Sequence, residues 1–216
     1  MKKLFFALSL TASLMVSCDD HFDLQDTSMK VGDILCADGD ILRFEDFSGS
    51  GKEPVGIVFY VNHDETVEGL GYAVYLFDLA PAAMSDTCGI SQKTSADVDA
   101  LDGNGNTFAL MNSQNAGSPL AEAVFDLWRY GQSAYIPSVA QYRHLYSHRG
   151  IVNSMLQRCR GDLLEEKADG CWYWSSTEVE GQSSQKAWLF SMQSGAIQET
   201  PKIQNHKSRA IITINK

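Results

Sequence analysis

Runs of apolar residues separated by polar segments predict a small set of strands. Residues 55–61 (VGIVFYV) form a continuous apolar and β-branched run, which predicts a strand buried on both faces. Residues 71–79 (GYAVYLFDL) predict its partner strand. Near the end of the chain, three more strands are predicted at residues 171–175, 186–192 and 209–214.

Helical spacing is confined to the middle of the chain. Residues 118–128 place apolar side chains three or four positions apart, with Pro119 in the first turn. Ser138 is the expected N-cap of a second helix that ends at Gly150, and residues 151–159 predict a third, short helix. Strands, then helices, then a terminal antiparallel set predict an α+β fold.

Polar segments predict two loops, at residues 85–106 and 178–186. The first is rich in Ser, Asp, Thr, Gly and Asn, so we expect it to lie on the surface. Loops of this kind on a rigid scaffold commonly carry binding residues.

Two patterns resemble metal sites without completing one. Residues 102–106 alternate Asp and Asn like the start of a calcium loop, but Thr107 and Ser113 stand where that loop needs Gly and Glu. A flexible Asn/Gly turn is therefore favoured. His144 and His148 have the spacing of paired zinc ligands, but the Glu of the metalloprotease motif is absent between them. We expect neither a metal nor a cofactor.

The first 17 residues have the pattern of a bacterial export signal. Two lysines precede residues 4–16, an uncharged stretch of roughly 20 Å as a helix, which is too short to span a membrane permanently. Met15-Val16-Ser17-Cys18 resembles the lipobox of bacterial lipoproteins, in which the Cys is acylated and becomes the new N-terminus. An ordinary signal peptide cleaved elsewhere is the alternative.

This pattern divides the chain into a signal peptide (1–17), an acylated Cys18 with a flexible acidic linker (18–30), and a single domain (31–216). Acidic residues directly after Cys18 resemble a display signal of some Gram-negative lipoproteins. We therefore expect a lipid anchor in the outer membrane, exposed at the cell surface.

Charge restricts the partners. The chain has 17 basic and 27 acidic residues, and removal of the two signal-peptide lysines leaves 15 against 27, a net charge of −12. Such a charge argues against nucleic acid as a partner and against binding to an anionic membrane surface through basic residues. The remaining partners are the membrane, through the lipid, and an unknown protein or glycan ligand.

Beyond Cys18 the chain has four cysteines, Cys36, Cys88, Cys159 and Cys171. An exported protein can form disulfides, and four cysteines allow three connectivities. We expect Cys159 and Cys171 to pair, because they would close a short loop. No Cys-x-x-Cys zinc motif is present.

Three stretches together resemble the Lcl C-terminal domain family, which is named for bacterial collagen-like adhesins and is related to the fibrobacter major paralogous domain. The N-terminal strands, residues 31–39 and 54–60, resemble the first stretch of the family. The segment Tyr135-Ile136-Pro137-Ser138 is similar to its central motif. The ending is carried by Tyr173, Trp174, Ser175, Ser176 and Glu178, followed by Trp188, Gly195 and Arg209.

The resemblance covers roughly residues 31–214 and implies a C-type-lectin-like fold, with small antiparallel sheets and two flanking helices. The calcium-binding tripeptides of sugar-binding C-type lectins are absent, since Ser175-Ser176 follow Trp174. The motif residues are therefore interpreted as structural, with Trp174 and Trp188 in the core.

Three hypotheses of function follow. The first is a non-enzymatic surface module for binding or adhesion. The alternative is a subunit or anchor of a fimbria-like surface assembly, in which a strand edge or the N-terminal segment pairs with a partner. The third, ranked last, is an enzyme related to the formylglycine-generating sulfatase modifiers, for which Cys171 is the one candidate reactive cysteine.

Overall fold

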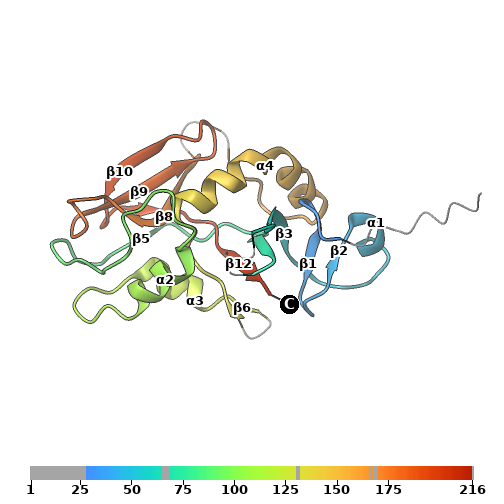
Figure 1. Ribbon diagram of the computed structural model, residues 1–216, viewed down its shortest axis with the longest axis horizontal. Coiled ribbons are helices and arrows are strands. Elements are labelled where there is room, and N and C mark those ends of the chain that lie inside the picture. The colour runs from blue at the N-terminus through green and yellow to red at the C-terminus, as the bar shows by residue number, and fades with distance from the viewer. Residues whose placement is uncertain (1–27, 65–68, 130–131, 166, 168–169, 216) are drawn as a thin grey trace, which may run out of the picture.

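A computed structural model describes residues 28–64, 69–129, 132–165, 167 and 170–215 of the chain. Over these residues it shows four helices and several small antiparallel sheets, which confirms the α+β class (Figure 1). The expected signal peptide and Cys18 lie outside the described residues. Met29, within the expected linker, already packs against the core.

The largest sheet has five strands in the order β12-β4-β3-β1-β2, and all neighbouring pairs are antiparallel. Its strands are β1 (Ile34–Cys36), β2 (Ile41–Leu42), β3 (Pro54–Val61), β4 (Gly71–Tyr75) and β12 (Ile211–Ile214). The first and last strands of the fold therefore belong to one sheet.

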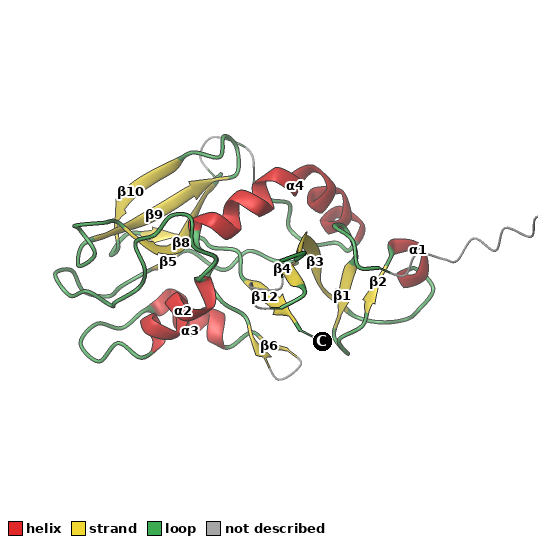
Figure 2. Ribbon diagram, viewed as in Figure 1, coloured by secondary structure: helices red, strands yellow, loops and turns green. Residues whose placement is uncertain are grey.

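A second sheet lies at the opposite end of the molecule from β1 and β2 (Figure 2). It has the order β10-β9-β8 and consists of β8 (Trp172–Glu178), β9 (Lys186–Ser191) and β10 (Ile197–Pro201). Two short ladders complete the strands: β5 (Ala82–Ala83) with β11 (Asn205–His206), and β6 (Trp128–Arg129) with β7 (Gln132–Ser133).

Helices cover the sheets on opposite sides (Figure 1). The helix α4 (Val139–Arg158) packs against one core cluster, whereas α2 (Gly103–Met111) and α3 (Pro119–Phe125) pack against the other. A short helix, α1 (Phe44–Phe47), follows β2. Within the described ranges, no helix has the length and apolar character needed to cross a bilayer.

Strand β4 shows why the central sheet is apolar throughout. Tyr72 and Val74 belong to the α4-side cluster, while Ala73 and Tyr75 belong to the cluster beneath α2 and α3. Because successive side chains of a strand point to opposite faces, a sheet covered on both faces needs a continuous apolar run. The sequence pattern of residues 55–61 and 71–79 is explained in this way, although β4 ends earlier, at Tyr75.

Both expected helix starts are confirmed. The Ser118 hydroxyl accepts a hydrogen bond from the Ala121 amide (3.2 Å) at the start of α3. Ser138 forms a reciprocal capping box with Gln141: the Ser138 hydroxyl accepts from the Gln141 amide (3.3 Å), and the Gln141 side chain accepts from the Ser138 amide (2.9 Å).

The expected helix end at Gly150 is wrong, since α4 continues without a break to Arg158 and includes the expected third helix. Leu145, Val152 and Leu156 are fully buried along one face of α4. Packing on both sides of Gly150 thus outweighs the roughly 1 kcal/mol preference of glycine for leaving a helix.

The expected surface loop at 85–106 also needs correction. Its last residues belong to α2, and Gln92 and Thr94 within it are buried. The Asp/Asn pattern at 102–106 therefore starts a helix rather than forming a calcium loop or a flexible turn.

Candidate ligand cavity and interaction surfaces

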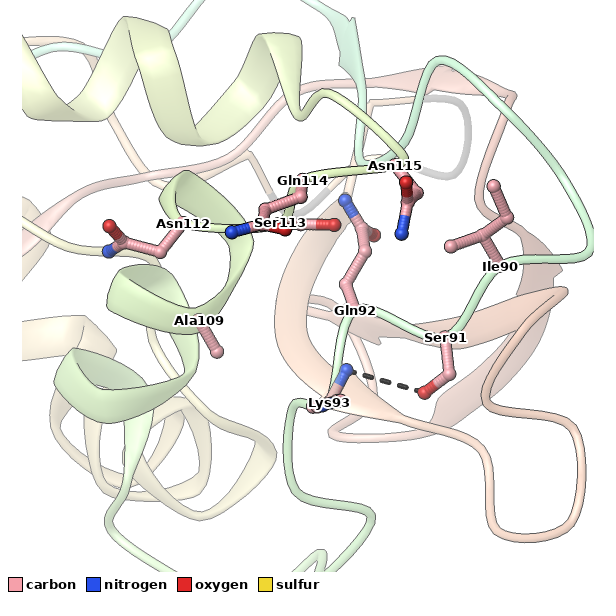
Figure 3. A pocket seen from close by; sticks show the side chains of 9 residues that line it. All are labelled: Ile90, Ser91, Gln92, Lys93, Ala109, Asn112, Ser113, Gln114 and Asn115. Atoms are coloured by element: carbon pink, nitrogen blue, oxygen red, sulfur yellow. Dashed lines mark hydrogen bonds between the residues drawn. The ribbon is translucent and has the colours of Figure 1, made fainter.

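An open cavity of about 410 Å³ lies between the segment that precedes α2 and the segment that follows it (Figure 3). One wall is formed by residues 90–93 and the other by residues 112–115, with Ala109 of α2 between them. The sequence offered no signal for residues 112–115, because they belong to no motif and are brought here by the turn after α2.

The cavity wall is polar and almost uncharged. Gln114 and Asn115 are exposed, and their amides make no hydrogen bond to another described residue. Lys93 has the left-handed backbone angle φ of 62°, which is uncommon for a residue other than glycine. Its amide donates to the Ser91 hydroxyl at 3.3 Å, as the dashed line in Figure 3 shows. No carboxylate is among the described residues that line this cavity, although the chain is strongly acidic. Such a wall suits a ligand rich in hydroxyl or amide groups.

A smaller, apolar hollow of about 220 Å³ lies on another part of α2. Phe108 and Phe125 border it with 69% and 48% of their surface exposed, and Met111 and Tyr135 contribute to the wall. Exposed aromatic residues around a hollow mark a surface that another protein can cover. We call this the Phe108–Phe125 surface.

Strand edges give two further surfaces. The outer side of β12 is hydrogen-bonded at Ile211, whose backbone exchanges two bonds with Tyr135 (2.9 and 3.0 Å). The outer edge of β10 carries Glu199, in an ion pair with Lys186 (3.0 Å), and Pro201, which has no amide hydrogen. A charge and a proline on an edge strand hinder pairing with another chain.

The aromatic-serine motif lies inside the molecule. Tyr173 and Trp174 are completely buried, and the Trp174 indole nitrogen donates to the carbonyls of Ala82 (3.2 Å) and Gln204 (3.3 Å). Ser175 donates to the Trp188 carbonyl at 2.7 Å. These contacts agree with a structural role for the motif. Trp188 itself is half-buried, and its indole nitrogen has no hydrogen-bond partner in the described part of the chain.

The remaining motif residues hold turns and strand ends. The carbonyl of Pro137 accepts from the Ser176 amide (2.8 Å), which joins the start of α4 to β8. Gly195 adopts a φ of 74° in the turn between β9 and β10, where a Cβ atom would lie 3.0 Å from the Tyr146 ring. Glycine is needed there for both conformation and space.

Arg209 is a buried junction between distant segments. Its guanidinium, fully buried, donates to the Asp78 carboxylate (2.5 Å) and to the carbonyls of Tyr75 (3.1 Å) and Asp162 (3.0 Å). Lys207 also pairs with Asp78, at 2.9 Å. A buried guanidinium with this many acceptors fixes segments relative to one another and leaves no donor for a ligand.

A second buried ion pair joins Glu178 to Lys202, which are 1% and 0% exposed. The Lys202 ammonium also contacts the Gln92 side-chain oxygen at 3.4 Å. Burial lowers the pKa of Lys202, against the effect of the neighbouring Glu178 carboxylate. Nothing in the spacing of the sequence pointed to this triad, because its members come from three separate elements.

Both members of the histidine pair contact neighbouring groups of the protein. His144 packs against the Tyr60 ring, with the ring centres 4.4 Å apart, and His148 Nδ1 lies 3.0 Å from the His144 carbonyl. Burial, and then the nearby His148, lower the pKa of His144. No group of three or more potential metal ligands occurs within the stretch of chain that the structure describes.

The expected disulfide between Cys159 and Cys171 is wrong. Both residues are thiols: Cys159 follows the end of α4, whereas the buried Cys171 sulfur accepts a hydrogen bond from the Ser191 hydroxyl (3.4 Å). The short sequence separation of Cys159 and Cys171 suggested a disulfide, but Cys171, just before β8, lies against Ser191 of β9. As the candidate reactive cysteine, Cys171 is only 1% exposed.

A solved structure resembles this chain over most of its length. No family model and no curated protein matches the chain. Its structure is similar to the crystal structure of a fimbrial protein from Bacteroides ovatus, with a TM-score of 0.67 and 15% sequence identity. The match covers 86% of this chain and 49% of the fimbrial protein, so this chain spans about half of that protein's length. At this identity the likeness establishes a shared fold.

Proposed function

We propose that this chain is a subunit or anchor of a fimbria-like surface assembly. The observation that carries the proposal is the fold shared with a fimbrial protein over 86% of the chain. The lipobox-like segment ending at Cys18 supports attachment to the outer membrane at the cell surface. No catalytic step is part of this proposal.

The finer description of the fold is also a proposal. Small antiparallel sheets, helices on both sides, and first and last strands in one sheet support a C-type-lectin-like domain. The motif residues that resemble the Lcl C-terminal domain family are consistent with that description, because Trp174 and Arg209 lie in the core.

The contact with a neighbouring subunit is proposed at the Phe108–Phe125 surface and the adjoining edge of β12. Tyr135 connects the two: it borders the hollow, and its hydroxyl lies 2.8 Å from the Thr213 hydroxyl on β12. The apolar surface would be buried against the neighbouring subunit, and main-chain pairing would use the part of β12 beyond Ile211, whose own backbone is paired with Tyr135. The β10 edge is a poorer contact because of Glu199 and Pro201.

A pull-down from intact cells, with the lipid anchor retained, tests this proposal. We expect the wild-type chain to co-purify in a high-mass surface complex, and the double variant Phe108→Asp/Phe125→Asp to be recovered without it at an unchanged melting temperature. Ile203→Asp, at a residue 52% exposed outside this surface, is the matched control and should retain the complex. Recovery of the wild-type chain as a lone monomer under these conditions would contradict an assembly role.

A second function, ligand binding or adhesion, is favoured by the polar cavity. The exposed amides of Gln114 and Asn115 are placed to bind a glycan or a peptide backbone. A glycan array probed with the wild-type protein and with Gln114→Ala/Asn115→Ala tests it. An equal signal from both proteins would show that glycans bind outside this cavity. If neither protein gave a signal, the glycans on the array would be excluded as ligands.

A further inference from the structure

The buried triad of Lys202, Glu178 and Gln92 brings together an amine, a carboxylate and a carboxamide. All three side chains are at most 2% exposed. Lys202 Nζ contacts a carboxylate oxygen of Glu178 and lies 3.4 Å from Gln92 Oε1. The three residues are at the end of β10, at the end of β8 and in the segment before α2.

Lys202 and Gln92 are each held in place by contacts of their own segment. The backbone amide of Lys202 donates to the Gln185 carbonyl (2.9 Å), and the Lys202 carbonyl accepts from the Met84 backbone amide (2.9 Å). The Gln92 amide nitrogen donates to the Ala116 carbonyl (3.3 Å), which orients its carboxamide toward Lys202. Groups held side by side in fixed orientations gain a large kinetic advantage over the same groups free in solution.

We propose that Lys202 and Gln92 join through an intramolecular amide bond, with Glu178 as the proton carrier. The ammonium of Lys202 gives a proton to Glu178, and the freed lone pair of Nζ attacks Cδ of Gln92. The Cδ–Nε2 bond then breaks, and its electron pair leaves with Nε2, which takes the proton from Glu178 and becomes ammonia. The Glu178 carboxylate, free again, removes the second Nζ proton and passes it to the ammonia, which leaves as ammonium. One Nζ–Cδ bond forms, one Cδ–Nε2 bond breaks, two protons move from Nζ to Nε2 by way of Glu178, and no oxidant or reductant is needed.

Two observations support this chemistry over a plain ion pair. Burial lowers the pKa of Lys202 against the effect of Glu178, which reduces the free-energy cost of forming the neutral, nucleophilic amine, as for other activated lysines. Gln92 also lines the open polar cavity, which gives the ammonium a path to solvent. Glu178 is assigned as the proton carrier and Gln92 as the acyl donor, because Glu178 is the carboxylate in contact with Lys202. If Glu178 were the acyl donor, no other described group of the triad would accept the protons that Lys202 loses.

The cross-link would join the segment before α2 to the end of β10. Tension applied through the ends of the chain would then pass through the amide bond and bypass the residues between positions 92 and 202. This is a useful property for a surface protein, but the chemistry does not depend on the fimbria-like function.

Peptide mapping by mass spectrometry of the full-length protein purified from cells tests the proposal. Because trypsin does not cleave after an acylated lysine, we expect the peptide Glu53–Lys93 joined to Ala187–Lys207, lighter than the sum of the two by one ammonia. Lys202→Arg keeps a positive charge beside Glu178, and Glu178→Gln removes the proton carrier. Both variants should lack the joined peptide.

Asn104→Gln, a substitution outside both peptides that leaves the triad intact, is the control. This variant should retain the joined peptide. Separate Glu53–Lys93 and Ala187–Lys202 peptides in the wild-type digest would overturn the proposal and leave a buried ion pair. The peptide Ala168–Lys186 joined through its Glu178 side chain to Ala187–Lys207, with the loss of one water, would also overturn it, because the acyl group would then come from Glu178.

Discussion

Replacement of Trp174 by Ala should destabilise the protein severely. The side chain is completely buried in the cluster beneath α2 and α3, and it meets the His206 ring edge-on with the ring centres 5.4 Å apart. Truncation of a buried Trp or Phe costs about 3–5 kcal/mol, and the carbonyls of Ala82 and Gln204 lose a shared donor. For a domain of this size the melting temperature should fall by on the order of 10 °C.

Trp174→Phe separates the two contributions. It keeps most of the apolar volume but removes the indole donor, so a smaller loss of about 1–3 kcal/mol is expected. The assay is urea unfolding followed by circular dichroism, with the free energy of unfolding extrapolated to water. Phe108→Ala, at a side chain 69% exposed, is the control and should change the stability little.

A Trp174→Ala variant within about 1 kcal/mol of the wild type would refute the reasoning, since that loss is below the range for a buried aromatic. Trp174 would then be interpreted as a residue that contacts a ligand and not as part of the core.

Four more outcomes are expected. Ser138→Ala should lower the free energy of unfolding by about 1 kcal/mol in urea, because α4 loses its cap. Burial lowers the pKa values of His144 and His206 below 6.5, so the unfolded chain binds protons that the folded chain does not. The free energy of unfolding, measured in urea, should therefore fall as the pH drops below 6.5. The double variant His144→Gln/His206→Gln should show a weaker dependence on pH. EDTA should leave the melting temperature nearly unchanged in calorimetry, and a large shift would reveal a metal site. Cys18→Ala should release the protein from the membrane fraction or leave it uncleaved on immunoblots, whereas normal processing and retention would contradict a lipid anchor.

The strand β3 and the start of α4 were predictable because one physical rule decided each of them. A continuous apolar run is required of β3, which is buried on both faces, and the Ser138 cap with Gln141 three residues later marks the start of α4. The strand predicted at residues 186–192 does not alternate between buried and exposed positions: Phe190 and Met192 are fully buried, and so is Leu189 on the other face of β9.

Helix α2 was missed because its sequence, Gly-Asn-Gly-Asn, has little intrinsic preference for a helix. Tertiary contacts hold it instead. The Asn106 side chain accepts from the Ser95 amide (2.8 Å), and the Thr107 hydroxyl accepts from the Ile136 amide (2.9 Å). At Gly103, a Cβ atom would lie 2.6 Å from the Ile136 carbonyl oxygen, so only glycine fits.

The cavity and the buried charges were unpredictable for a different reason. Spacing along a chain reveals groups that share one element, whereas Glu178, Lys202 and Gln92 meet only after three segments have folded together. The same holds for Arg209 and Asp78, which are 131 residues apart. Such pairs are a property of topology, which local sequence patterns do not encode.

The position of β12 in the central sheet bears on how the molecule is made. Ile211–Ile214 pair with Gly71–Tyr75, so this part of the sheet closes a loop of well over a hundred residues and depends on the final segment of the domain. Long-range pairing of this kind slows folding, because closing the loop costs conformational entropy before the stabilising contacts form. A chain still being synthesised therefore lacks one of the two strands that flank β4 until residues 211–214 have been made. The central sheet is then among the last parts of this domain to be completed.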